Sequence, residues 1–210
     1  MSLDFLSPAA TAIARSPMER EAVAAGATIE QRDGWSVAVS FEGEAGRLET
    51  VAFADRSQIG KLEVQGEHGL TLGEAVQRDG AWWCPLTKDR ALVLCEPAST
   101  AGLRERFGPA AVDLTSAMGA LTIAGPLARE AFARFTAIDL RPQVTPVHGF
   151  RPGSVARTPG AILRESEDRW LMLFGAALGS YVWTVVADAA AGLGGGPVGA
   201  DVLVEVAAGA

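Results

Sequence analysis

Five polar residues in two short segments are the best candidates for chemistry in this chain. Asp55 and Ser57 precede Lys61 in the first segment, and Asp113 and Thr115 stand in the second. A carboxylate, a hydroxyl and an ammonium on one loop can face a ligand. The same carboxylate and hydroxyl can instead cap backbone N–H groups in a turn.

The two segments repeat one pattern. Residues 55–66 read DRSQIGKLEVQG and residues 113–125 read DLTSAMGALTIAG. Each has Asp, one residue, Ser or Thr, a short gap to Gly, and then alternating apolar positions that end in Gly. The repeat predicts two related halves that join near residue 110. Because a duplicated scaffold need not carry two sites, the repeat favours a structural role for the shared residues.

Two adjacent tryptophans are candidates for ligand contact. Trp82 and Trp83 lie in a strand-like run, so their rings should face opposite sides of a sheet. One ring is then expected in the core. The other is free to pack on a partner or to stack on a flat heterocycle.

Other reactive residue types lack a supporting motif. His68 and His148 stand in Gly-flanked stretches and are interpreted as surface loop residues. Cys84 and Cys95 are expected to be buried thiols, and no zinc-ligand spacing is visible. The glycine-rich run 193–197 has no Lys-Ser or Lys-Thr after it, so it is interpreted as a linker rather than a phosphate loop.

Composition is typical of a globular protein and limits the partners. The chain has 210 residues, 49% hydrophobic and 20% charged, which is enough for one large domain or two packed subdomains. The net charge of −7 argues against nucleic acid or an anionic membrane as the main partner. No secretory signal and no membrane-spanning run is apparent. We therefore expect a cytoplasmic protein.

Turn and cap signals predict short strands and a few helices. Asp33-Gly34 between alternating runs is a strong hairpin signal, and Ser16-Pro17 marks a helix start. Helices are predicted over residues 17–25, 70–77, 99–107, 126–138 and 176–190. Strands are predicted over Ala27–Arg32, Trp35–Phe41 and residues 51–54, 61–65, 81–86, 91–95, 112–115, 120–124, 155–157, 161–164 and 170–174. Residues 143–153 are predicted to be a connector.

This order predicts an α+β fold and not a doubly wound parallel sheet, because strands and helices do not alternate one by one. The expected division is an N-terminal arm (residues 1–16), a first α+β subdomain (17–109), a second α+β subdomain (110–191) and a glycine-rich tail (192–210). Within that tail, residues 192–199 are expected to be flexible, and residues 202–206 are a possible edge strand.

Several segments resemble one protein family. Gly26-Ala27, Asp33-Gly34-Trp35 and residues 51–66 resemble the opening of the glycine-cleavage T-protein (aminomethyltransferase) family. The rest is similar to a shortened relative, the gamma subunit of heterotetrameric sarcosine oxidase, in segments 15–19, 112–115, 123–131, 138–140, 150–154 and 180–183. The resemblance implies the tetrahydrofolate-binding T-protein fold, with two duplicated α+β subdomains around a central opening and without the C-terminal barrel of full T-proteins.

The chain departs from the family where folate chemistry is done. T-proteins carry an Asp-Asp pair where this chain has residues 81–85, AWWCP, and a Tyr and a Glu in a motif that here continues from Arg157-Thr158 as PGAIL. Without a fixed carboxylate, the amide and amino donors of a pterin lose their acceptor. A surviving site is therefore expected to be weak. The residues expected around it are Asp55, Ser57, Lys61, Trp82, Trp83 and Arg157, and no catalytic or metal-binding residue is assigned.

The resemblance implies a role in one-carbon and methylated-amine metabolism. The favoured hypothesis is a sarcosine oxidase gamma-subunit-like protein, non-catalytic by itself, whose partners are flavoprotein subunits of a sarcosine oxidase-type oxidoreductase; a homo-oligomer is the alternative assembly. The alternative function is a stand-alone folate-dependent aminomethyltransferase or folate-binding protein. Tetrahydrofolate is the implied cofactor, in a weak or lost site. No flavin is expected on this chain alone, because it has no dinucleotide motif.

Overall fold

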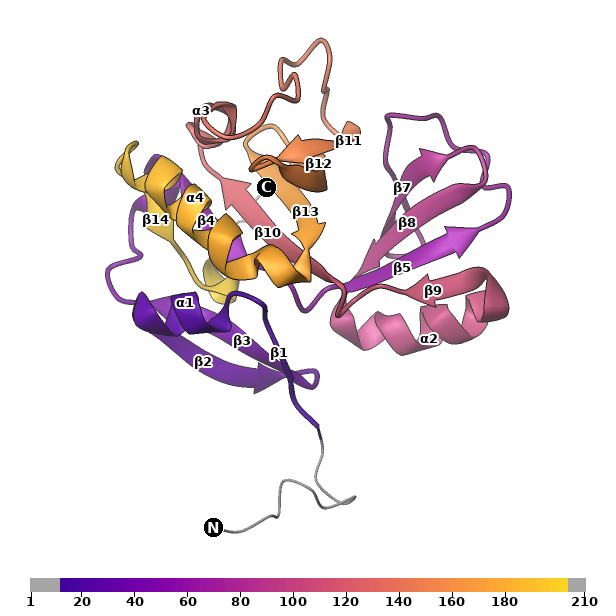
Figure 1. Cartoon of the computed structure of the whole chain (residues 1–210), viewed down its shortest axis with the longest axis horizontal. Helices are drawn as coiled ribbons and strands as arrows, with labels where there is room; N and C mark the ends of the chain where they lie inside the picture. Colours follow the sequence, from indigo (N-terminus) through magenta and orange to yellow (C-terminus); the bar gives the residue numbers. More distant parts are fainter. Residues whose placement is uncertain (1–11, 204–210) are drawn as a thin grey trace.

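The computed structural model of the chain describes residues 12–203 and forms three sheets with helices on their outer faces (Figure 1). The sheets have the strand orders β1-β3-β2, β11-β12-β13-β10-β4-β14 and β6-β7-β8-β5-β9. The strands are β1 (Ala14–Arg15), β2 (Ala27–Arg32), β3 (Trp35–Phe41), β4 (Ala52–Asp55), β5 (Gly60–Gln65), β6 (Val76–Arg78), β7 (Ala81–Thr87), β8 (Arg90–Cys95), β9 (Ala111–Asp113), β10 (Met118–Ala124), β11 (Phe150–Val155), β12 (Thr158–Ser166), β13 (Arg169–Gly175) and β14 (Gly196–Pro197).

The helices cover the sheets from outside. The α-helices are α1 (Glu19–Ala24), α2 (Pro97–Phe107), α3 (Ala128–Ala133) and α4 (Gly179–Ala191), and the 3-10 turns are η2 (Arg47–Glu49), η3 (Gly108–Ala110) and η4 (Ala176–Leu178). Helices α1, α3 and α4 contribute to the largest hydrophobic cluster, which also contains Phe53, Trp170 and Phe174 from the six-stranded sheet. Helix α2 covers the five-stranded sheet through Leu103 and Phe107.

The five- and six-stranded sheets pack against each other through a second hydrophobic layer. Leu92 and Leu94 of β8 meet Leu163 of β12 and Leu171 and Leu173 of β13 in this layer. Side chains alternate between the faces of a strand. The neighbouring residues of β13 therefore point to the helical side, and those of β8 point to α2. The layer buries apolar surface on both sheets and fixes their separation.

Two crossings connect these sheets. The chain passes from β4 in the six-stranded sheet to β5 in the five-stranded one, and later from β9 back to β10. Strands β4 and β10 pair antiparallel with Asp55 opposite Leu121, and β5 and β9 pair antiparallel with Asp113 opposite Leu62. The two crossings thus lie side by side and are related by a local two-fold arrangement. The division at residue 110 stays a prediction, and each sheet takes a strand from both sides of it.

The repeated glycines are required at this crossing by close packing. A Cβ atom on Gly60 would lie 2.5 Å from the Cys95 sulfur, and one on Gly119 would lie 2.5 Å from the Phe174 ring. Real Cβ contacts do not come this close. The glycine of the sequence repeat therefore lets each crossing strand approach the neighbouring side chains.

Most predicted elements are present, and the first hairpin is confirmed to the residue. Strands Ala27–Arg32 and Trp35–Phe41 pair antiparallel across Asp33 and Gly34, both of which have positive φ. The α+β class is confirmed. Helix α2 begins at Pro97, two residues before the predicted start, because Pro97 occupies its first turn.

Four predicted elements differ from the structure. Residues 70–77 form no helix: Gly73 has φ +92°, and Glu74 bridges to Gly149 in extended pairing. The helix from Pro126 spans only Ala128–Ala133, since Thr136 then bridges to Val155. Of the predicted strand 155–157, only Val155 is in a strand, as the last residue of β11, and residues 156–157 form a hairpin turn; β11 also occupies part of the predicted connector.

The C-terminal segment also differs from expectation. The predicted flexible tail contains β14, which pairs with β4. Directly after β14, the Val198 N–H donates a hydrogen bond to the Phe53 carbonyl at 2.8 Å. Residues 200–203 are helical rather than an edge strand, and residues 204–206 lie outside the described residues, as do residues 1–11 of the predicted arm. The spacing of apolar residues in the last helix predicts that Tyr181 faces inward, but its side chain is 44% exposed, whereas Trp183 is 6% exposed.

Candidate functional site

A polar cleft lies where the hydrophobic layer between the two large sheets ends. It consists of a hollow of about 180 Å³ and an adjoining one of about 600 Å³. The walls common to both are Arg56, Gln77, Trp82, Glu96 and Glu165. We call this the inter-sheet cleft.

Strand periodicity places the cleft residues. Glu96 follows Leu92 and Leu94 at two-residue spacing, and Glu165 follows Ala161 and Leu163 in the same way. Each strand therefore continues its inward-facing series with an acid at the edge of the layer.

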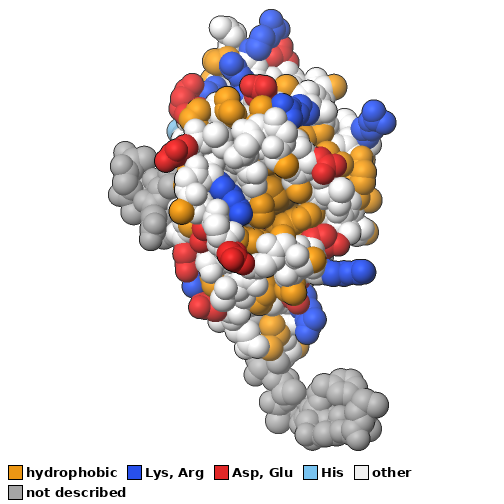
Figure 2. Space-filling model, turned by 90° about the vertical axis from the view of Figure 1, so that its left-hand side faces the viewer, with side chains coloured by type: hydrophobic (Ala, Val, Ile, Leu, Met, Phe, Trp, Pro, Cys, Tyr) orange, Lys and Arg blue, Asp and Glu red, His pale blue; other side chains and the backbone are white. Residues whose placement is uncertain are grey.

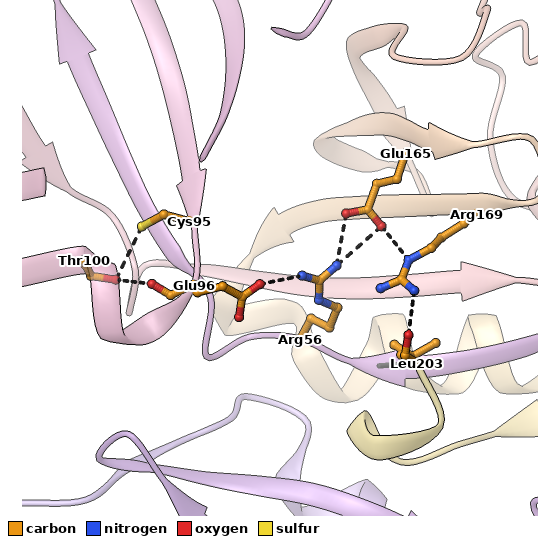
Figure 3. Close-up of polar contacts among 7 residues, drawn as sticks. All are labelled: Arg56, Cys95, Glu96, Thr100, Glu165, Arg169 and Leu203. Atoms are coloured by element: carbon orange, nitrogen blue, oxygen red, sulfur yellow. Dashed lines mark hydrogen bonds and ion pairs between the residues drawn. The ribbon is translucent and has the colours of Figure 1, made fainter. Parts of the chain in front are cut away.

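Three charged side chains form a chain across the cleft wall (Figure 3). The Arg56 guanidinium donates through Nη1 to both oxygens of Glu165, at 3.0 and 3.4 Å. Arg169 donates through Nε to Glu165 Oε2 at 3.0 Å and through Nη1 to the Leu203 carbonyl at 2.9 Å. The side chains of Arg56, Glu165 and Arg169 are 16%, 11% and 17% exposed. One carboxylate is thus held between two guanidinium groups, which leaves it little capacity to accept from a ligand.

A fourth charge, Glu96, is attached loosely. Its carboxylate lies 3.6 Å from Arg56 Nη2, and its side chain is 72% exposed. An exposed ion pair of this kind contributes about 0–1 kcal/mol. Arg56 is therefore the cation of the cleft with an exchangeable partner.

Trp82 supplies the aromatic wall of the cleft. Its ring is half-buried and stands edge-on to His148, with centroids 5.0 Å apart. The nearby Cys95 thiol contacts Thr100, and burial raises the pKa of this thiol, so it stays protonated at neutral pH. The cleft therefore offers stacking and ion pairing rather than a thiolate nucleophile.

The repeated acids Asp55 and Asp113 both act within turns. Asp55 Oδ1 accepts from the Ser57 N–H at 2.8 Å, and Asp113 Oδ1 accepts from the Thr115 N–H at 2.9 Å. Asp55 also accepts from the Ser16 hydroxyl and is 8% exposed. Burial raises the pKa of Asp55, and its hydrogen bonds to Ser16 and Ser57 oppose that shift.

The hydroxyls of the repeat join the two crossings. Ser57 Oγ accepts from the Ala120 N–H at 3.2 Å, and Thr115 Oγ1 accepts from the Lys61 N–H at 3.1 Å. Ala120 and Lys61 occupy the same position of the repeated pattern, directly after its glycine. The polar residues of the repeat thus support the crossing itself.

Lys61 is enclosed in the crossing rather than open to the cleft. Its side chain is fully buried, and Nζ donates to the carbonyls of Ser57 and Ile59 at 2.8 Å each and of Thr115 at 3.2 Å. Burial lowers the pKa of Lys61 to about 8. The three carbonyls use the donors of this ammonium, so it is not presented to a ligand in this conformation.

The remaining expected site residues are separated from one another. Trp82 lines the inter-sheet cleft, but Trp83 is 8% exposed on the opposite face of β7 and packs on Phe107 at 5.5 Å. Arg157 lies in the β11–β12 turn, at φ +61°, beside a different hollow that Tyr181 also lines. The structure therefore brings together Asp55, Ser57 and Lys61 in the crossing, and places Trp82 alone in the cleft.

Sequence reasoning did not single out Arg56, Glu96, Glu165 and Arg169. Arg56 stands at a variable position of the repeat, and the other three stand at strand ends. The available signal was the alternation itself, because Glu96 and Glu165 extend two inward-facing apolar series.

Two features are absent from residues 12–203, a cluster of metal-ligand side chains and a membrane-spanning helix. Within residues 12–203, no group of three or more His, Cys, Asp or Glu side chains is arranged to hold a metal ion. No helix of this part of the chain is long and apolar enough to cross a membrane. Cys84 and Cys95 are both buried free thiols, as predicted.

Comparison with known proteins gives similarity in structure but not in sequence. No family model matches the chain, and no curated protein matches it. A chain of heterotetrameric sarcosine oxidase from Corynebacterium sp. U-96, in a complex with pyrrole 2-carboxylate, superposes with a TM-score of 0.65 and 21% identity, over 85% of this chain and 95% of that chain. Glycine cleavage system aminomethyltransferase T from Bartonella henselae superposes with a TM-score of 0.72 and 14% identity.

The second alignment covers 89% of this chain and 60% of the aminomethyltransferase chain. The two neighbours are a chain of a heterotetrameric sarcosine oxidase and an aminomethyltransferase T, so the resemblance seen in the sequence segments is confirmed at the level of fold. The chain has the α+β fold of the T-protein type.

Proposed function

We propose that this chain is a sarcosine oxidase gamma-subunit-like protein of one-carbon and methylated-amine metabolism, non-catalytic by itself. In this role it is a cytoplasmic accessory subunit that binds the flavoprotein subunits of a sarcosine oxidase-type complex. Those subunits would oxidise the amine with flavin, and this chain would supply scaffold and surface.

The observation that carries the proposal is the extent of the structural match. The alignment takes in 95% of the sarcosine oxidase chain but only 60% of the aminomethyltransferase chain. The alignment thus includes nearly the full length of a chain that belongs to a larger assembly.

The cleft chemistry supports a non-catalytic role. In the described part of the chain, the carboxylates that line the cleft are Glu96, Glu165 and Asp168. Glu165 is held by two guanidinium groups, and Glu96 and Asp168 are exposed. A general acid or base is normally enclosed in its site, and neither of these exposed acids is enclosed.

We further propose that the tetrahydrofolate site is weak or lost. Of the six residues expected around it, Trp82 is the one that lines the inter-sheet cleft, while Asp55, Ser57 and Lys61 use their polar groups inside the crossing. A pterin in the cleft would have a ring to stack on, but the enclosed carboxylate, Glu165, is already occupied by Arg56 and Arg169 and is not free for its N–H donors.

Hydrophobic side chains on the helical face support a protein partner. Figure 2 shows a hydrophobic area near the centre of the face on the side of α1, β14 and the end of α4, with charged side chains at its margins. Val23 of α1 is 53% exposed and Tyr181 of α4 is 44% exposed. Exposed apolar side chains of this size on the helices are candidates for contact with a protein partner.

The test is copurification from native cells at native expression. We expect tagged wild-type chain to bring flavoprotein subunits with it in a fixed ratio, and Val23→Glu or Tyr181→Glu to weaken this association. Val112→Glu is the matched control, because Val112 is similarly exposed, at 47%, on β9 of the other large sheet. Recovery of the wild-type chain free of any flavoprotein would contradict the proposal.

A stand-alone folate-dependent aminomethyltransferase or folate-binding protein is the second candidate. The higher TM-score of 0.72 with aminomethyltransferase T favours it. Methylenetetrahydrofolate formation from an aminomethyl donor by the purified chain, above a control without protein, would support this candidate.

A further inference from the structure

We propose that the inter-sheet cleft binds a small aromatic carboxylate, whose anion replaces Glu96 on Arg56 and whose ring lies against Trp82. This inference goes beyond the accessory role and does not rest on it, because it concerns a ligand of the isolated chain.

The cleft has the size and lining of a ligand site. Ligand pockets commonly measure about 300–1,000 Å³ and combine apolar walls with a few polar groups. The larger hollow of about 600 Å³ falls in this range, and the Trp82 ring borders it together with Leu48 and Pro126.

The cation of the site is fixed before the ligand arrives. Arg56 is held by Glu165, and Glu165 is held from its other side by Arg169 (Figure 3). These three groups carry one net positive charge. Because their side chains are largely buried, the guanidinium needs little ordering when it binds an anion.

The anion that now faces Arg56 is the easiest one to displace. Glu96 stands 3.6 Å from Arg56 Nη2 with its side chain 72% exposed, so it can rotate into water at small cost. A ligand carboxylate can then make the short, paired hydrogen bonds that arginine offers to carboxylates.

The same contacts disfavour two other ligand classes. A neutral heterocycle with several N–H donors needs a free carboxylate, but Glu165 already accepts at both oxygens. A cationic ring would have to approach Arg56 and Arg169, whose two positive charges are compensated only in part by the single carboxylate of Glu165. Once Glu96 moves away, Arg56, Glu165 and Arg169 keep one net positive charge at the wall, and the other acid that lines the larger hollow, Asp168, is exposed.

The experiment is calorimetric titration of the purified full chain with three matched compounds at low salt. Benzoate, benzamide and benzylammonium share one ring and differ in charge. We expect benzoate to bind with a Kd on the order of 1 mM and the other two at least about fivefold more weakly. Added salt should weaken the benzoate complex.

Variants locate the site on this wall of the cleft. Glu96→Gln should tighten benzoate binding by up to about fivefold, since it removes a competing ion pair that contributes at most about 1 kcal/mol. Trp82→Leu should weaken it by about two- to tenfold. Glu30→Gln, which removes one negative charge from an exposed ion pair on β2, should leave it unchanged.

Several results would overturn the proposal. They are equal binding of benzamide and benzoate, tighter binding of benzylammonium or of a neutral pterin, and a Glu96→Gln variant that binds benzoate no better than Glu30→Gln. Absence of benzoate binding at roughly 50 mM to both the wild-type chain and Glu96→Gln would overturn it as well. Because Glu96 is exposed, its variant should fold, and the test does not depend on changing Arg56.

Discussion

The two crossing turns have the same hydrogen-bonding scheme but different side-chain environments. In each, an Asp caps the N–H two residues later, and a Ser or Thr hydroxyl accepts an N–H from the other turn. The backbone also matches: the Arg56 N–H donates to the Ala120 carbonyl at 2.9 Å, and the Leu114 N–H donates to the Lys61 carbonyl at 2.8 Å.

The differences lie at the positions that the repeat does not share. Arg56 faces the cleft, whereas its counterpart Leu114 packs on the hydrophobic layer between the sheets. Lys61 places a buried ammonium in the first turn, where the second has Ala120. Shared residues thus maintain the crossing, and the unshared ones decide which side carries charge. Substitutions at equivalent positions test this comparison.

Lys61 should show the largest effect. Lys61→Met would leave three buried carbonyls without their donor and should lower the free energy of unfolding by at least about 3 kcal/mol. Lys88→Met, in the exposed turn after β7, should change it by less than about 0.5 kcal/mol. Denaturant unfolding of both variants measures the difference, and a Lys61→Met loss below about 1 kcal/mol would show that the ammonium is not needed.

Replacing the acid should also destabilise the protein more in the first turn than in the second. Asp55→Ala removes the cap on Ser57 and the contact with Ser16 in a buried position, and should cost about 2–4 kcal/mol. Asp113→Ala removes one cap at a side chain that is 31% exposed, and should cost about 1 kcal/mol. Equal losses in urea unfolding would contradict the difference between the turns.

The two hydroxyls should instead behave alike. Ser57→Ala and Thr115→Ala each leave one N–H of the opposite crossing without its acceptor, and each should cost about 1–2 kcal/mol. Thermal unfolding of both variants checks this equality. A loss confined to one of them would mean that the shared hydrogen bonds are not equivalent in energy.

The pH dependence isolates the buried ammonium. Burial lowers the pKa of Lys61 from 10.5 to about 8 in the folded state. Between these values the unfolded chain binds the extra proton, so the folded state gains stability as the pH rises above about 8. Where this dependence is steepest, the free energy of unfolding should rise by about 1.4 kcal/mol per pH unit. We expect this slope in the difference between the wild-type chain and Lys61→Met; a flat or falling difference from pH 7.5 to about 9.5 would contradict it.

The sequence predicted helices and strands well where a local signal specifies them, and less well where tertiary packing imposes the conformation. Asp33-Gly34 specifies its hairpin because a two-residue turn with positive φ suits these residues. The turn at Ala156 and Arg157 has the same geometry without glycine, and Ala156 is buried, so tertiary packing imposes a conformation that the sequence does not signal.

The candidate site was predictable in part. A tryptophan in the cleft was predictable because the adjacent residues Trp82 and Trp83 on one strand must face opposite sides of the sheet. Lys61 was expected near a ligand, but whether an ammonium meets a ligand or three carbonyls depends on how the two crossings approach, and no single segment encodes that. Arg56 reaches Glu165 across 109 positions of sequence, which local patterns do not reveal.

The most direct test of the accessory role is the activity of the chain as isolated from its native cells. Tagged chain purified at native expression should carry flavin absorbance and consume oxygen when sarcosine is added, whereas recombinant chain purified alone should do neither. Native material that contains this chain alone, without flavin, and that forms methylenetetrahydrofolate from an aminomethyl donor would contradict the accessory role.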